Sequence, residues 1–252
     1  MDFWQKQIRR AEELAGRSDV SHELLVFYAR LLQAQSDVYQ LLTARDLSRD
    51  LDRDLPAFRS AFSLILKAVE DAGPRPLVEH AQVLRTQSME AIDELLLSYW
   101  QSPSDTEFFA KAFLQPYGYF IGEPEAAVID ERRCPQCGGK PQLSFLQNKE
   151  SNAESGNRDL ICAKCLWIWP FRRVVCANCG EEEPARLAYF QSPSIDHVRV
   201  EACETCKHYL KSVDLTRLGI AQPLVDEVAA APLDLWATDH GYTKIELNLV
   251  GL

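Results

Sequence analysis

Residues 134–138 read Cys-Pro-Gln-Cys-Gly, and the pattern returns at 162–166 (Cys-Ala-Lys-Cys-Leu), 176–180 (Cys-Ala-Asn-Cys-Gly) and 203–207 (Cys-Glu-Thr-Cys-Lys). These four pairs hold all 8 cysteines of the 252-residue chain. Two cysteines on one tight turn can point both sulfurs at a single ion, and two such turns complete a tetrahedral shell of four thiolates. Because thiols stay reduced in the cytosol, the pattern predicts metal sites rather than a disulfide framework.

The spacing of the pairs shows an internal repeat. Cys134 and Cys176 are 42 positions apart, Cys162 and Cys203 are 41 apart, and each unit is a pair, a gap of 24 or 23 residues, and a second pair. Because each unit is self-contained, the repeat groups consecutive pairs, and an interleaved cross-brace is the alternative. The expected metal ligands are Cys134, Cys137, Cys162 and Cys165 at a first site, and Cys176, Cys179, Cys203 and Cys206 at a second.

The residues around the pairs favour small β modules. Apolar and polar residues alternate after Pro141, after Pro184 and again over 197–201, which is typical of strands. A glycine follows the second cysteine at Gly138 and Gly180, where a positive φ lets backbone amides turn toward the sulfurs. The polar stretch 147–158 is expected at a hairpin tip. We therefore expect two tandem zinc-ribbon or rubredoxin-like modules.

Four cysteines do not fix the metal. A tetrahedral shell of four thiolates suits zinc and also a single iron, and an iron–sulfur cluster is a weaker alternative. The sequence therefore predicts two metal ions per chain, iron or zinc, and leaves open whether they are structural or redox-active.

The first half of the chain lacks cysteines and its pattern predicts helices. Apolar residues recur at three- and four-residue intervals within 24–42, 58–69 and 92–99, and Asp54 is the expected N-cap of the second stretch. We predict an α+β fold. Its expected parts are an all-α helical domain at 1–128, ribbon modules at 129–170 and 171–212, and a C-terminal tail at 213–252 with helices at 223–230 and 233–239 and a strand at 243–249.

Composition and charge exclude several classes of function. The net charge of −10 argues against general binding to nucleic acid or to an anionic membrane. No run of 18 apolar residues predicts a transmembrane helix, and the polar start is unlike a secretory signal, so a cytoplasmic location is expected. No nucleophile–base set is recognisable, so no catalytic residue is predicted and the chain is not expected to be an enzyme.

Two residues between the sites are candidates for binding a partner. Trp169 lies on a short strand that follows the second cysteine pair, and Arg173 stands three residues before Cys176. Tryptophan and arginine are common interface anchors. For the strand that carries Trp169, packing between the two modules is the favoured role, and an exposed anchor for a partner is the alternative. Arg132, Arg133 and Arg172 lie beside the ligands as well, and they either offset thiolate charge through N–H···S contacts or form solvated surface.

From residue 130 onward the chain resembles the formate dehydrogenase accessory protein FdhE family. The matching features run through both ribbons: Cys134-Pro135-x-Cys137-Gly138, Leu160-x-Cys162-x-x-Cys165, Trp169, Arg173, Cys176-x-x-Cys179-Gly180, Tyr189-Phe190, Glu201-x-Cys203-x-x-Cys206, Tyr209-Leu210-Lys211, Leu233-Asp234 and Gly241-Tyr242.

The resemblance implies a cytoplasmic maturation factor, a chaperone-like protein rather than an enzyme. It implies that the partner is the catalytic subunit of formate dehydrogenase before export, and that rubredoxin-like metal shells linked to iron organise the binding surface. Trp169 and Arg173 are then the candidate partner-binding residues. An iron-based redox or electron-transfer protein and a zinc-ribbon nucleic-acid-binding protein are the alternatives, and the oligomeric state is left open.

Overall fold

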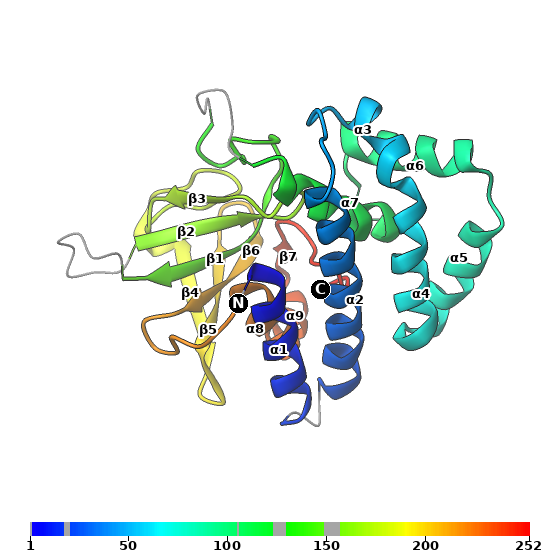
Figure 1. Ribbon diagram of the computed structural model, residues 1–252. Coiled ribbons are helices and arrows are strands. Elements are labelled where there is room, and N and C mark those ends of the chain that lie inside the picture. The colour runs from blue at the N-terminus through cyan, green and yellow to red at the C-terminus, as the bar shows by residue number, and fades with distance from the viewer. Residues whose placement is uncertain (1, 18–20, 105, 123–129, 149–156) are drawn as a thin grey trace. The chain divides into compact units, whose positions relative to one another are not determined.

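The computed structural model describes residues 2–17, 21–104, 106–122, 130–148 and 157–252. The chain divides into two compact units, Met1–Gly122 and Glu123–Leu252 (Figure 1). The first is helical, and the second is built on a sheet that carries both groups of four cysteines. The α+β class, with helices first and cysteine-bearing ribbons after them, is confirmed.

The helical unit is organised around one long central helix, α2 (His22–Thr43). Helices α1 (Phe3–Ala15), α4 (Phe62–Ala72) and α7 (Phe108–Phe120) pack against α2. The remaining elements are α3 (Leu51–Phe58), the 3-10 turn η1 (Arg59–Ala61), α5 (Arg75–Arg85) and α6 (Met89–Gln101). The apolar stripe predicted over 58–69 is therefore divided between α3 and α4 by the 3-10 turn.

The expected N-cap at Asp54 is wrong. Helix α3 begins at Leu51 and is capped by Asp50, whose side chain accepts from the amide of Asp52. Asp54 lies inside the helix, is 4% exposed, and accepts hydrogen bonds from the amides of Ser48 and Arg49 and from the hydroxyl of Tyr117. These bonds lower the pKa of the Asp54 carboxyl although burial acts to raise it. Asp54 therefore serves the helical core rather than a helix end.

The second unit contains one sheet with strand order β3-β2-β1-β6-β5-β4, and β7 pairs with β6. The strands are β1 (Pro141–Gln147), β2 (Asn157–Cys162), β3 (Ile168–Phe171), β4 (Leu187–Ser192), β5 (Ile195–Cys203), β6 (His208–Asp214) and β7 (Thr243–Lys244). A 3-10 turn, η2 (Pro184–Arg186), leads into β4. The strands predicted after the two prolines and over 197–201 are present. Most of the expected hairpin tip, 149–156, lies outside the described residues.

The two ribbons share this sheet. Strands β1 to β3 come from the first ribbon and pair antiparallel, as do β4 to β6 of the second. Between them β1 pairs with β6 in parallel, with Leu143 opposite Lys211 and Phe145 opposite Val213. The modules are thus tandem in sequence and continuous in hydrogen bonding, and the division of this unit at residues 170 and 212 stays a prediction.

The tail folds onto one face of the sheet. Helix α8 (Pro223–Ala229) contacts β1 and β6, and α9 (Ala231–Asp239) contacts β5. Both helices were expected, whereas the strand predicted over 243–249 is wrong in length and covers only Thr243–Lys244. Buried charges join these layers, because Lys211 and Lys244 both pair with Glu227 and Asp234.

Candidate metal centres

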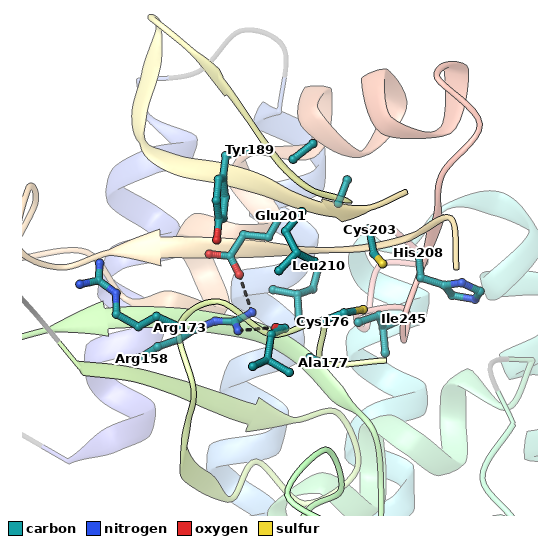
Figure 2. Close-up of a pocket in the computed structure, with 14 residues that line it drawn as sticks. Arg158, Arg173, Cys176, Ala177, Tyr189, Glu201, Cys203, His208, Leu210 and Ile245 are labelled. Carbon is teal, nitrogen blue, oxygen red and sulfur yellow. Dashed lines mark hydrogen bonds and ion pairs between the residues drawn. The ribbon is translucent and has the colours of Figure 1, made fainter. Parts of the chain in front are cut away.

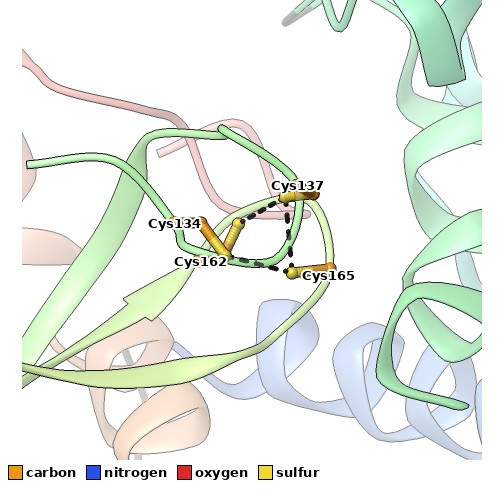
Figure 3. Close-up of side chains that lie close together, drawn as sticks. All are labelled: Cys134, Cys137, Cys162 and Cys165. Atoms are coloured by element: carbon orange, nitrogen blue, oxygen red, sulfur yellow. Dashed lines mark hydrogen bonds between the residues drawn. The ribbon is translucent and has the colours of Figure 1, made fainter. Parts of the chain in front are cut away.

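The first cluster consists of Cys134, Cys137, Cys162 and Cys165, whose sulfur atoms all lie within 4.8 Å of one another (Figure 3). The Sγ–Sγ distances are 3.5 Å from Cys134 to Cys165, and 3.4 Å from Cys137 to both Cys162 and Cys165. The second cluster consists of Cys176, Cys179, Cys203 and Cys206, within the same limit. Its distances are 3.7 Å for Cys176–Cys206 and for Cys179–Cys203. The grouping is sequential, as the repeat predicts, and not interleaved.

All four cysteine turns have the same backbone. The amide of the residue after each second cysteine donates to the carbonyl of the first, at 2.9 Å for Gly138, 3.1 Å for Leu166, 3.0 Å for Gly180 and 2.9 Å for Lys207. Each of these residues has a positive φ, which is +70° and +81° at the glycines and +59° and +56° at Leu166 and Lys207. The left-handed conformation is strained for leucine and lysine. The positive φ was therefore predicted at the two turns that contain glycine. The other two turns adopt the same conformation without a glycine.

Backbone amides point at the sulfurs. Lys164 and Asn178 each donate to the sulfur two residues earlier, at 3.4 Å. The amides of Gly139, Glu181 and His208 donate in the same way to Cys137, Cys179 and Cys206. Such bonds stabilise negative charge on a thiolate. They orient metal-ligating sulfurs in the manner of outer-shell partners.

The donor set and its dimensions fit a tetrahedral metal ion. A zinc–sulfur bond of about 2.3 Å in a regular tetrahedron places sulfurs about 3.8 Å apart, close to the distances in both clusters. Burial raises the pKa of Cys162 well above its usual range, because a buried thiolate loses its hydration. A divalent ion offsets that cost when it binds the deprotonated ligand. The eight cysteines could therefore hold two ions, and four sulfurs do not distinguish zinc from iron.

The clusters differ in burial. Three cysteines of the first cluster, Cys134, Cys162 and Cys165, are buried. They belong to an apolar core that also contains Leu160, Trp169, Phe171 and Leu210. In the second cluster Cys179 is exposed and Cys206 is half-buried. A small pocket beside the second cluster reaches Cys176 and Cys203 (Figure 2).

The arginines beside the ligands contact carboxylates and carbonyls. Arg132 pairs with Asp130, and its Nη1 also reaches the carbonyl of Asn178 at 3.5 Å. Arg172 bridges Glu131 and Glu182 on the surface. Through these contacts the arginines join chain segments around the clusters. The hydrogen bonds to the sulfurs come from the backbone amides described above.

The structure places the two candidate partner-binding residues differently. Trp169 is 4% exposed and its Nε1 donates to the carbonyl of Glu131 at 2.9 Å, so it lies in the core, as the sequence favoured. Arg173 is exposed at the rim of the pocket, and no described carboxylate pairs with it. A role in binding a partner stays a prediction for both residues.

Sequence reasoning missed Arg158 and Glu201 as a site. Arg158 on β2 and Glu201 on β5 form an ion pair, and their side chains are 3% and 8% exposed (Figure 2). The strand order places β1 and β6 between the two residues. Glu201 was singled out only as part of a family motif, and nothing in the sequence near Arg158 indicates a partner more than forty positions away.

None of the helices in the described part of the chain has the length and apolar character needed to cross a membrane.

Comparison with known proteins points to one family. The family model described as "FdhE, C-terminal domain" matches residues 174–250. The protein named FdhE homolog from Aquifex aeolicus is 29% identical, and the match covers 97% of this chain and 94% of that protein. The FdhE homolog of Pseudomonas aeruginosa is 32% identical over 52% of this chain and 44% of its own length.

A solved structure has the same fold. The crystal structure of the FdhE protein from Pseudomonas aeruginosa matches with a TM-score of 0.71 at 24% sequence identity, over 99% of this chain and 95% of that one. The family model in the second ribbon and the relatives that align along nearly the whole sequence show that this chain is similar to proteins of the FdhE family.

Proposed function

We propose that this chain is a cytoplasmic accessory protein that binds the catalytic subunit of formate dehydrogenase during its maturation, and that it is not an enzyme. The observation that carries the proposal is the match to FdhE homologues along nearly the whole chain, with both four-cysteine clusters complete. We propose further that each cluster holds one metal ion, iron or zinc, through its four sulfurs.

The metals organise a surface rather than transform a substrate. Loss of the ligands would free the cysteine turns from the ion that holds them together, so it costs binding by collapse of the surface that they form. The surface around the second cluster offers groups that an interface uses, since Tyr189 is 48% exposed and Arg199 stacks on its ring at 4.7 Å. Exposed Arg173 lies at the same pocket. Aromatic and arginine side chains are enriched in the central contacts of interfaces.

A pull-down with the tagged catalytic subunit of formate dehydrogenase tests this proposal. We expect Arg173→Ala to weaken capture at least about thirtyfold, which corresponds to the roughly 2 kcal/mol of an interface hot spot, while the metal content stays at two ions. Arg172→Ala is the matched control, because Arg172 is next in sequence and its own guanidinium group already pairs with Glu131 and Glu182. Capture at the wild-type level by Arg173→Ala would remove this residue from the interface.

A second variant separates packing from recognition. Trp169→Ala empties a buried position of the first ribbon, so we expect it to lower the metal content along with capture. Weak capture with both metals retained would instead give Trp169 a direct contact with the partner. Failure of the wild-type chain to capture the subunit in any metal-loaded form would contradict the proposed function.

A further inference from the structure

We propose that Arg158 is the positioning residue that couples the two four-cysteine clusters. Its guanidinium group joins its own strand to two other segments of the chain, and each of the three segments leads to a cysteine of a cluster. Its Nη1 donates to the carbonyls of Arg172, at 3.0 Å, and of Val175, at 3.1 Å, and its Nη2 donates to Glu201. The guanidinium carbon lies 5.2 Å from the centre of the Phe171 ring.

Each of these contacts lies close to a ligand along the chain. Arg158 belongs to β2, which ends at Cys162 of the first cluster. Val175 immediately precedes Cys176, and Glu201 stands two residues before Cys203, so both lead into the second cluster. The contacts therefore run from a strand of the first ribbon to both cysteine turns of the second. Figure 2 shows the contact between Arg158 and Glu201 as a dashed line.

Burial makes this contact set strong. The carboxylate of Glu201 also accepts from Arg199 at 2.7 Å and from Ser144 at 3.3 Å, so three side chains hold it in place inside the sheet layer. Removing one partner of a buried pair leaves the other charge uncompensated, which is strongly destabilising.

The consequence is reciprocal coupling between the clusters, and this inference rests on the proposed metal binding. A metal ion in the first cluster fixes the end of β2 and with it Arg158, which then fixes the turn that begins at Cys176. Filling the first cluster thus raises the affinity of the second, and by linkage the reverse holds for binding free energies. Lysine cannot replace the arginine, because a single ammonium lacks the planar fork that reaches carbonyls and carboxylate together.

The experiment is pulse alkylation with peptide mass mapping on the full chain loaded with zinc and exposed to a chelator. In Arg158→Lys we expect the second-cluster cysteines to be labelled about tenfold faster than in the wild type, the loss for one charged hydrogen bond. Labelling of the first cluster should be unchanged, because the more exposed second cluster empties first and the coupling is then already lost. Glu201→Gln keeps the bonds to both carbonyls but leaves the buried charge of Arg158 without its carboxylate, so it should also speed labelling of the second cluster. Arg217→Lys, at an exposed arginine beyond the end of β6, is the matched control.

A second measurement keeps Arg158 intact. In Cys134→Ser/Cys137→Ser, the empty first cluster should speed labelling of the second about tenfold, and adding Arg158→Lys should add little further. Wild-type labelling of the second cluster in both variants, or equal acceleration of both clusters in Arg158→Lys, would overturn the coupling. A wild-type chain that retains no zinc would instead contradict the proposed metal binding itself.

Discussion

The two cysteine clusters arise from the same repeated pattern and share a backbone geometry, yet their surroundings differ. The first is built into an apolar core with Leu160, Trp169 and Phe171, whereas the second leaves Cys179 exposed. The two clusters have the same four ligands but differ in burial, so we expect them to have different roles. The buried cluster is expected to stabilise the ribbon unit, and the exposed cluster to carry the surface that meets a partner.

The largest expected difference follows from removing one cluster at a time. Cys134→Ser/Cys137→Ser should leave one metal ion per chain, held by the second cluster, and should destabilise the ribbon unit by several kcal/mol, since metal binding to such sites is folding free energy. Cys176→Ser/Cys179→Ser should also leave one ion but cost clearly less, because its ligands are more exposed. Metal analysis and chemical unfolding under reducing conditions check both. Equal losses of stability would remove the contrast between the clusters.

A chelator should reveal the same order without mutation. The chelator and the alkylating agent reach Cys179 directly but must open the core to reach Cys162, so we expect the second cluster to lose its ion at least about tenfold faster, in line with the low local stability of exposed sites. Time-resolved alkylation mapped to each cysteine measures both rates. Faster labelling at Cys134 and Cys165 would reverse the assignment of the buried cluster as the stable one.

The two turns without glycine give a sharper contrast. Lys207 is exposed, so Lys207→Gly should relieve its left-handed strain and stabilise by up to about 1 kcal/mol, less whatever its contact with Glu204 contributes. Leu166 is 4% exposed, so Leu166→Gly should lose about 2 kcal/mol or more of apolar burial and be destabilising overall. Denaturant midpoints of the metal-loaded variants test the opposite signs. A change in stability of the same sign in both variants would mean that burial does not decide the effect of glycine at these turns.

The smallest expected effect concerns the close packing around the first cluster. A Cβ added at Gly139 would lie 3.0 Å from the sulfur of Cys162 and 3.2 Å from that of Cys137, so Gly139→Ala should push the sulfurs apart and weaken metal affinity a few-fold. Glu181 is the matching position of the second cluster and already carries a Cβ, so Glu181→Ala should change affinity less. Chelator competition compares the two, and an unchanged affinity for Gly139→Ala would show that the first cluster adapts freely.

The spacing of the cysteines predicted the two groups of four correctly because each cysteine turn is local and is encoded within five residues. The alternation of apolar and polar residues after Pro141 and Pro184 likewise located β1 and β4. The parallel pairing of β1 with β6 was beyond such reasoning, since Leu143 and Lys211 meet only in the folded sheet. Arg158 could not be recognised for the same reason, as its partners come from distant segments.

Local signals also failed where the fold overrides propensity. Leu166 and Lys207 adopt a glycine-like backbone because the cysteine turn imposes it, and no residue type in the sequence announces this. Asp54 resembled a helix cap, but the buried hydroxyl of Tyr117 and two loop amides give it partners inside the helix instead.

The measurement that bears most directly on the account is metal analysis combined with metal-edge X-ray absorption on chain purified without oxygen. The account predicts two ions per chain, each in a first shell of four sulfurs, with one ion lost from either double-cysteine variant. A stoichiometry near one in the wild type, or nitrogen or oxygen in the first shell, would contradict it.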